Sequence, residues 1–319
     1  FEIEFQEYMQ FKFRQQWMKL KAYANENGIK IIGDIPIYVA MDSADTWANP
    51  WLFKLDEKNC PTQVAGCPPD GFSATGQLWG NPLYNWEVHR NSGYEWWIKR
   101  IANCFRLYDV VRIDHFRGFD EYYAIPYGDA TAENGWWEKG PGIDLFRAIS
   151  ASLGDREIIA EDLGYMTDSV KRLVEESGYP NMKVIEFAFD ERDTGNASDY
   201  LPHNYPRNCV VYTGTHDNET LLSWLEDITP AERRQVRKYL NNFKDSGKEL
   251  CDDLICLVMQ SVANLCIVPM QDYLGLDNSA RMNQPSTLGK NWKWRLKEGQ
   301  LTAELQKEML ELATRYGRR

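Results

Sequence analysis

The sequence predicts an α/β fold, a parallel (β/α)8 TIM barrel that is incomplete and carries loop insertions. Six short apolar runs are each followed by a segment with helical spacing, and this alternation is typical of right-handed β-α-β units in a parallel sheet. Three acidic residues, Asp114, Glu161 and Asp217, each stand at the end of such a run. Catalytic residues of parallel barrels gather at the carboxyl ends of the strands, so the three acids predict an active site there.

The first half of the chain begins with a helix and then alternates strands with helices. Apolar side chains at helical spacing predict a helix over residues 7–26, and Gly28 stands where its C-terminal cap would lie. Residues 41–92 are rich in Pro, Gly and Trp, and we expect a substrate-lid loop there, inside a single catalytic domain that spans residues 1–319. The other elements of this half are strands at 29–39, 109–114 and 157–161 and helices at about 97–108 and 143–153.

The second half continues the alternation of strands and helices. Thr167 is a residue type that caps helix N-termini, and the helix that it starts would end at Gly178. The remaining predicted elements are strands at 182–187, 209–215 and 266–270, helices at about 229–243 and 248–263, and a final amphipathic helix around 305–316.

Six predicted strands are two fewer than a closed (β/α)8 barrel contains. Because the chain begins inside a predicted helix with no strand before it, we expect a C-terminal fragment that lacks the first two barrel strands. The alternative is a complete six-stranded open sheet of the doubly wound kind. The sequence does not support it, since it has neither a Gly-x-Gly-x-x-Gly pattern nor a phosphate-binding loop.

Charge and composition argue against several classes of protein. The net charge is −11 and no block of Lys or Arg occurs, so we expect neither nucleic acid nor a membrane as a partner. The N-terminal residues lack the pattern of a signal peptide, and we predict a cytoplasmic protein. The seven cysteines form no Cys-x-x-Cys pair, which favours reduced, structural thiols over a disulfide framework or a zinc ribbon.

The first two acids suit the cleavage of a glycosidic bond with retention. That reaction needs a carboxylate nucleophile and, about 5 Å away, a carboxylic acid that protonates the leaving oxygen. Arg112 lies two residues before Asp114 on one strand and shares its face, so it would keep Asp114 ionised as the nucleophile. The longer Glu161 would be the acid, with a raised pKa. Asp162 is the alternative acid, but it should point the other way.

The third acid lies in Thr215-His-Asp-Asn-Glu, where His216 and Asp217 would bind adjacent sugar hydroxyls. A metal site is the alternative, because His115 beside Asp114 and the histidine beside Asp217 could supply ligands. With four histidines in all and no His-x-His pattern, we do not expect a metal. Any one of the acids could be a salt-bridged or helix-capping carboxylate, but three in this order favour an active site.

Six stretches of the sequence resemble one enzyme family. The first three are similar to conserved regions of the α-amylase clan in the form found in 4-α-glucanotransferases, also called amylomaltases or disproportionating enzymes; they are Arg112-Ile-Asp-His-Phe-Arg-Gly-Phe, Ala160-Glu-Asp-Leu-Gly and Thr215-His-Asp-Asn. The other three resemble that family rather than amylases; they are Gly33-Asp-Ile-Pro-Ile-Tyr-Val-Ala-Met-Asp-Ser-Ala-Asp-Thr-Trp, Gly66-Cys-Pro-Pro-Asp-Gly-Phe-Ser-Ala-Thr-Gly-Gln-Leu-Trp-Gly-Asn-Pro and Asn291-Trp-Lys-Trp-Arg. The resemblance runs nearly from end to end.

The resemblance implies a retaining transferase that moves α-1,4-glucan segments between maltooligosaccharides and needs no cofactor. It implies that Asp114 is the nucleophile, Glu161 the general acid/base and Asp217 the stabiliser of the transition state, on strands that correspond to the third to eighth of the barrel. The substrate-binding residues that it implies are Arg112, His216, Asn218, Tyr38, Asp70 and Trp79.

Two other functions are weighed against glucan transfer. A plain α-1,4-glucan hydrolase would use the same acids with water as the acceptor, and a non-catalytic module would bind glucan without turnover. The Gly-rich stretch at 68–82 favours transfer, because a lid with aromatic residues could bind an acceptor and exclude water. Within that stretch, Gly71 stands where bulkier residues occur in the family.

Overall fold

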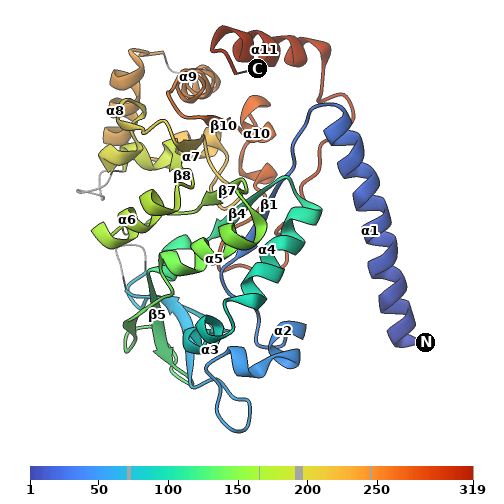
Figure 1. Ribbon diagram of the computed structural model, residues 1–319. Coiled ribbons are helices and arrows are strands. Elements are labelled where there is room, and N and C mark those ends of the chain that lie inside the picture. Colours follow the sequence, from blue (N-terminus) through green and yellow to red (C-terminus); the bar gives the residue numbers. More distant parts are fainter. Residues whose placement is uncertain (70–72, 165, 191–196, 245, 319) are drawn as a thin grey trace. The chain divides into compact units, whose positions relative to one another are not determined.

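The computed structural model describes residues 1–69, 73–164, 166–190, 197–244 and 246–318 (Figure 1). The chain divides into two compact units, Phe1–Asn181 and Met182–Arg319. All seven cysteines are free, as predicted. Among the described residues, no helix has both the length and the apolar character needed to cross a membrane.

The first unit contains three adjacent parallel strands. They lie in the order β1 (Ile32–Pro36), β4 (Val110–Asp114) and β7 (Ile158–Ala160), and each is shorter than the sequence predicted. All three residues of β7 and the first four of β4 are buried, and all of these except Arg112 are apolar. At the edge of β7, Ala160 pairs with Asn181, the first residue of β8 (Asn181–Val184).

Three helices connect or follow these strands, as the sequence predicted. Both α4 (Glu95–Leu107) and α5 (Ile143–Leu153) are amphipathic, and they contact each other. The next helix, α6 (Asp168–Ser177), begins after Thr167, whose side chain accepts a hydrogen bond from the Val170 N–H. It ends at Gly178, which adopts φ +70°, so both predicted caps are confirmed.

The N-terminal helix α1 (Glu2–Glu26) begins earlier than the predicted 7–26 (Figure 1, blue). It ends at Asn27, and Gly28 follows with φ +75°, the left-handed conformation typical of the residue after a helix. No residue of α1 is buried. Two side chains tie it to the end of α4, because Trp17 donates a hydrogen bond to the Leu107 carbonyl (2.9 Å) and Lys21 pairs with Asp109 (3.1 Å).

The prediction of one long irregular loop over residues 41–92 was wrong. This region contains the helices α2 (Ala44–Ala48) and α3 (Trp86–Asn91), the 3-10 helix η1 (Pro50–Leu52) and the strands β2 (Gln63–Cys67) and β3 (Gln77–Pro82). With β5 (Glu121–Pro126) and β6 (Trp136–Lys139), the two strands form an antiparallel sheet in the order β3-β2-β5-β6. Because Gly66 interrupts the apolar pattern, the sequence did not predict β2. A Cβ at Gly66 would lie 2.1 Å from the Gln77 carbonyl oxygen, so the close approach of β3 requires glycine.

The second unit contains β9 (Cys209–Tyr212) and β10 (Leu265–Ile267), which pair in parallel, and β8 lies next to β9 in the order of strands. The predicted strand at 266–270 was too long, because Pro269 precedes the short helix α10 (Met270–Tyr273). The longer helices of this unit are α7 (Leu221–Asp227), α8 (Pro230–Leu240), α9 (Gly247–Met259) and α11 (Ala303–Arg315). The sequence did not predict α7, which has only seven residues.

In the described parts of the chain, two short 3-10 helices follow strands, and three more lie in the second unit. These are η2 (Phe116–Phe119) after β4, η3 (Ile185–Phe189) after β8, and η4 (Ala197–Tyr200), η5 (Pro202–Asn204) and η6 (Asn278–Ala280) elsewhere in the second unit. The second of these corrects the predicted strand at 182–187, whose later residues belong to η3.

Candidate active site

In the first unit, two of the predicted acids lie at the ends of neighbouring strands. Asp114 is the last residue of β4, and Glu161 directly follows β7. The register pairs Ile113 with Ala160, one residue before each acid, so the two acids occupy equivalent positions on adjacent strands. Their side chains therefore belong to one carboxyl edge of the parallel strands, as the sequence predicted.

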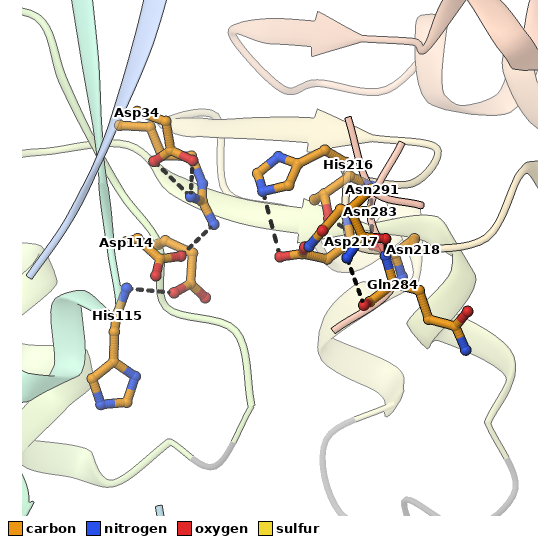
Figure 2. A network of polar contacts seen from close by, with 12 residues as sticks. Asp34, Asp114, His115, His216, Asp217, Asn218, Asn283, Gln284 and Asn291 are labelled. Atoms are coloured by element: carbon orange, nitrogen blue, oxygen red, sulfur yellow. Dashed lines mark hydrogen bonds and ion pairs between the residues drawn. The ribbon is translucent and has the colours of Figure 1, made fainter. Parts of the chain in front are cut away.

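Two carboxylates labelled in Figure 2, Asp34 and Asp114, contact the guanidinium of Arg112. One guanidinium nitrogen, Nη1, is 2.7 Å from each oxygen of Asp34, and Nη2 is 3.0 Å from Asp114 Oδ1. Burial disfavours the charge of Arg112, but the surrounding carboxylates outweigh it and raise the pKa of the guanidinium. The predicted contact between Arg112 and Asp114 is present. A permanent cation at this distance favours the ionised form of Asp114.

The Glu161 side chain is buried and held by two backbone N–H groups. Its Oε2 accepts a hydrogen bond from the His115 N–H and its Oε1 from the Leu163 N–H, both at 2.7 Å. Burial, and then the charge of Asp114, raise the pKa of Glu161 to about 7, against the opposing effects of Arg112 and the two N–H groups. A carboxyl with this pKa can both give and take a proton near neutral pH.

The backbone at His115 is part of the same arrangement. His115 adopts φ +54°, a left-handed conformation that is costly for a residue other than glycine, and its N–H donates to Glu161. The neighbouring acid, Asp162, has a different partner, because it accepts a hydrogen bond from the Asn181 side chain at 3.3 Å. Asp162 thus contacts a residue of the next strand, in agreement with the predicted opposite orientation.

Two of the predicted subsite residues lie close to His115. The ring of Trp79 meets that of His115 edge to face at a centroid distance of 4.8 Å, and Tyr38 lies 6.3 Å from Trp79. Tyr38 is buried, whereas Trp79 is 37% exposed and can contact a ligand. The predicted residues Asp70 and Gly71 lie outside the described residues. The roles of Tyr38, Trp79 and Asp70 stay predictions.

In the second unit, the residues after β9 form their own polar network (Figure 2). His216 Nε2 lies 3.4 Å from Asp217 Oδ2, and both side chains are partly exposed. The Asn218 Oδ1 accepts hydrogen bonds from the Thr215 backbone N–H (2.9 Å) and hydroxyl (2.8 Å). Asn218 therefore closes the turn that presents His216 and Asp217, in addition to the substrate contact predicted for it.

Sequence reasoning missed three residues that hold these acids. Asp34 contacts Arg112 in the first unit. In the second unit, the Asn283 side chain donates to Asp217 Oδ1 and the Arg281 guanidinium to the Asp217 carbonyl, each at 2.6 Å. Asp34 lies opposite Arg112 in the pairing of β1 with β4, a register that the sequence alone does not reveal. Within the ranges that the structure describes, no group of three His, Cys, Asp or Glu side chains could hold a metal ion.

Comparison with known proteins identifies the family. The sequence model of a family described as 4-alpha-glucanotransferase matches residues 1–302. The chain belongs to the 4-alpha-glucanotransferase family. It is 52% identical to the 4-alpha-glucanotransferase of Streptococcus pneumoniae, over 97% of this chain and 60% of that protein. Over 99% of this chain, it is 49% identical to the 4-alpha-glucanotransferase of Clostridium butyricum, of which 64% is covered.

A solved amylomaltase from Streptococcus agalactiae, in complex with acarbose, matches the structure with a TM-score of 0.91 and 43% identity. The match covers 97% of this chain and 61% of that one. The chain thus spans about 60% of the length of the 4-alpha-glucanotransferases that it resembles. The family and the barrel fold that the sequence predicted are both confirmed.

Proposed function

We propose that the complete protein is a retaining 4-α-glucanotransferase that moves α-1,4-glucan segments between maltooligosaccharides through a covalent glycosyl-enzyme. Its substrates would be maltooligosaccharides and longer α-1,4-glucans, and neither metal nor cofactor takes part. The observation that carries the proposal is the pair at the strand ends: Asp114, kept ionised by Arg112, beside Glu161, whose pKa is about 7. A retaining mechanism needs this division of one carboxylate and one acid.

In the first step, an Asp114 oxygen attacks the anomeric carbon of the donor and forms a glycosyl ester. Glu161 gives its proton to the leaving glycosidic oxygen, so the bond to that oxygen breaks and the shorter chain departs as an alcohol. In the second step, Glu161 takes the proton of the acceptor hydroxyl, whose oxygen attacks the anomeric carbon and releases Asp114. The number of glycosidic bonds stays constant, and the enzyme returns to its starting protonation state.

Asp217 would stabilise the transition state by accepting hydrogen bonds from sugar hydroxyls, which strengthen as the ring flattens toward an oxocarbenium ion. Its bond from Asn283 fixes one carboxylate oxygen and leaves lone pairs on the other, next to His216. Tyr38, Trp79 and Asp70 would contact glucose units in the donor or acceptor subsites. The cytoplasm remains the predicted location.

The test of transfer uses the full-length protein with maltotriose as the only substrate. Transfer predicts free glucose together with a ladder of longer maltodextrins, while the total of reducing ends stays constant. Hydrolysis would instead raise the reducing ends and give only glucose and maltose. If maltotriose binds without any product, the site is a glucan-binding module. Either of these two results would refute the proposed function.

The pH dependence follows from the raised pKa of Glu161. The free enzyme must hold a proton on Glu161 to cleave the donor, and this proton is lost above the pKa of about 7. We therefore expect kcat/KM for maltotriose to fall about tenfold per pH unit above about pH 7. The stability of the fold should fall in the same direction. Because the pKa of Glu161 is higher in the folded state than in the unfolded state, its contribution to the free energy of unfolding is full below the unfolded pKa and is lost as pH rises through about 7.

The measurement is kcat/KM for maltotriose between pH 5 and pH 9, with the full-length protein. A profile that stays flat up to pH 9 would contradict the assignment of Glu161 as the acid.

A further inference from the structure

One buried carboxylate ties both ends of the segment that carries His216, Asp217 and Asn218. Asp272, on α10, is 2% exposed. Its Oδ2 accepts a hydrogen bond from the Thr213 hydroxyl at 2.6 Å, and its Oδ1 accepts one from the Leu221 N–H at 2.9 Å. Thr213 directly follows β9, and Leu221 is the first residue of α7. Asp272 therefore fixes the distance between the two ends of residues 213–221.

A second buried carboxyl supports the middle of the same segment. Glu186, on η3, is 5% exposed, and a Cβ at Gly214 would lie 2.7 Å from its Oε1. The Asn218 Cβ lies 3.2 Å from the same Cβ position at Gly214, and the Asn218 Oδ1 accepts a hydrogen bond from the Thr215 N–H. Glu186 Oε1 has no hydrogen-bond partner among the residues that the structure describes. The carboxyl thus packs directly beneath the turn that presents Asp217.

We propose that Asp272 and Glu186 are positioning residues that hold Asp217 in place for glucan transfer, by bracing residues 213–221 at both ends and in the middle. The inference rests on the proposed function, because it assigns the bracing to the role of Asp217 in the transition state. Neither residue touches the substrate in this scheme, and each acts through its contacts with residues 213–221. A shift of Asp217 by about 1 Å is enough to lower a rate a hundredfold.

The two carboxyls lie in different electrostatic surroundings. Burial raises the pKa of both groups. For Glu186 the charges of Asp272 and Glu219 raise it further, to well above its usual value, and the opposing effects of Asn218 and Arg281 are smaller. The hydrogen bonds from Thr213 and Leu221 oppose the rise for Asp272. These effects favour the protonated form of Glu186 more than that of Asp272.

The packing and the hydrogen bonds of the two carboxyls decide which substitutions are conservative. Glu186→Gln keeps a polar group of the same shape against Gly214 and should retain the function, whereas Glu186→Met keeps a similar volume without a polar group. Asp272→Asn can still accept from the Leu221 N–H and can donate to the Thr213 hydroxyl, whereas Asp272→Ala loses both ties. Comparing the two variants at each position thus separates the effect of the polar contacts from the effect of filling the space.

The experiment compares these four variants in the full-length protein. With maltotriose, we expect Asp272→Ala to lower kcat about a hundredfold at a KM within about threefold of wild type, and Asp272→Asn to recover at least about tenfold. Glu186→Met should lose about tenfold in kcat and Glu186→Gln no more than about threefold. Hydrogen exchange of residues 213–221 should be faster in Asp272→Ala and Glu186→Met than in wild type.

Thr229→Val is the matched control for stability. It removes the hydroxyl that caps α8 by accepting from the Glu232 N–H, in the same unit but outside residues 213–221. It should lower Tm and change kcat by no more than about twofold, because it does not move Asp217.

Three results would overturn the inference: a folded Asp272→Ala with kcat near wild type, an Asn variant as impaired as the Ala variant, or unchanged exchange over residues 213–221. If Asp272→Ala does not fold, the comparison of Glu186→Gln with Glu186→Met decides, and equal kcat in these two refutes the inference. If wild type transfers no glucan, the proposed function fails. Hydrogen exchange still shows whether the two carboxyls brace the segment.

Discussion

Replacing Asp114 with asparagine is expected to lower kcat for glucan transfer by roughly 10⁴-fold or more, because an amide cannot form the glycosyl ester of a retaining mechanism. The fold should tolerate the change. Arg112 keeps both contacts with Asp34 when the Asp114 carboxylate is gone, so no buried cation is left without a partner. The measurement is the steady-state conversion of maltotriose by the full-length protein, with thermal unfolding as the test of folding.

Asp34→Asn is the control that separates nucleophile from electrostatic partner. Asp34 contacts the same guanidinium as Asp114, and the two side chains are similarly exposed, at 40% and 43%. We expect Asp34→Asn to lower kcat only about tenfold. The change weakens the contacts that orient Arg112 but leaves the attacking oxygen of Asp114 in place. If both variants lose kcat equally, Asp114 acts only through its pairing with Arg112, and its assignment as the nucleophile is wrong.

The second large effect is expected at Glu161. Glu161→Gln should lower kcat for maltotriose by about 10²- to 10⁴-fold, because the amide can neither give the proton of the first step nor take the proton of the second. One of the two backbone N–H groups that now bind Glu161 would face the new amide nitrogen. We therefore also expect a decrease in Tm of about 2–4 °C.

The role of Glu161 can be separated from a general loss of structure by the choice of donor. α-Glucosyl fluoride releases fluoride without help from an acid, so Glu161→Gln should form the glycosyl ester from it at a near-normal rate. The ester should then accumulate on the peptide that contains Asp114, where mass spectrometry can detect it. Added azide needs no general base and should release it as glucosyl azide.

Asp162→Asn is the matched control for Glu161, since Asp162 is also buried and acidic but binds Asn181. Its kcat should stay within about threefold of wild type. If Glu161→Gln is as slow with α-glucosyl fluoride as with maltotriose, or if Asp162→Asn loses as much kcat, Glu161 is not the acid/base.

The parts of the site that lie on one strand could be predicted from the sequence, and those that depend on remote contacts could not. Arg112 and Asp114 share a strand, so the period of two places their side chains on one face. Asp34 reaches Arg112 across the pairing of β1 with β4, and Asn283 reaches Asp217 from 66 positions further along the chain. Neither contact leaves a periodic signal. The family resemblance covers Asp34, in the stretch that begins at Gly33, but it does not cover Asn283.

The fold shows the same division. Helices with both a cap and an apolar face, such as α6 with Thr167 and Gly178, were predicted nearly to the residue. The sequence did not predict the antiparallel sheet of the first unit, because Gly66 lies inside β2 and a glycine usually indicates an interruption of a strand. That glycine exists because another strand passes close to it, which is a property of the folded chain.

The hydrogen bonds of Asp272 have a consequence for exchanging parts between relatives. Protein engineers often treat the loop after a barrel strand as a module that can be transplanted alone. Residues 213–221 are not such a module. Their two ends are hydrogen-bonded to Asp272 on α10, and Asp217 accepts a hydrogen bond from Asn283. A chimera that receives this loop without residues 270–283 of the same parent should inherit its sequence but lose its geometry. To keep the geometry, residues 213–221 and residues 270–283 must be transferred together.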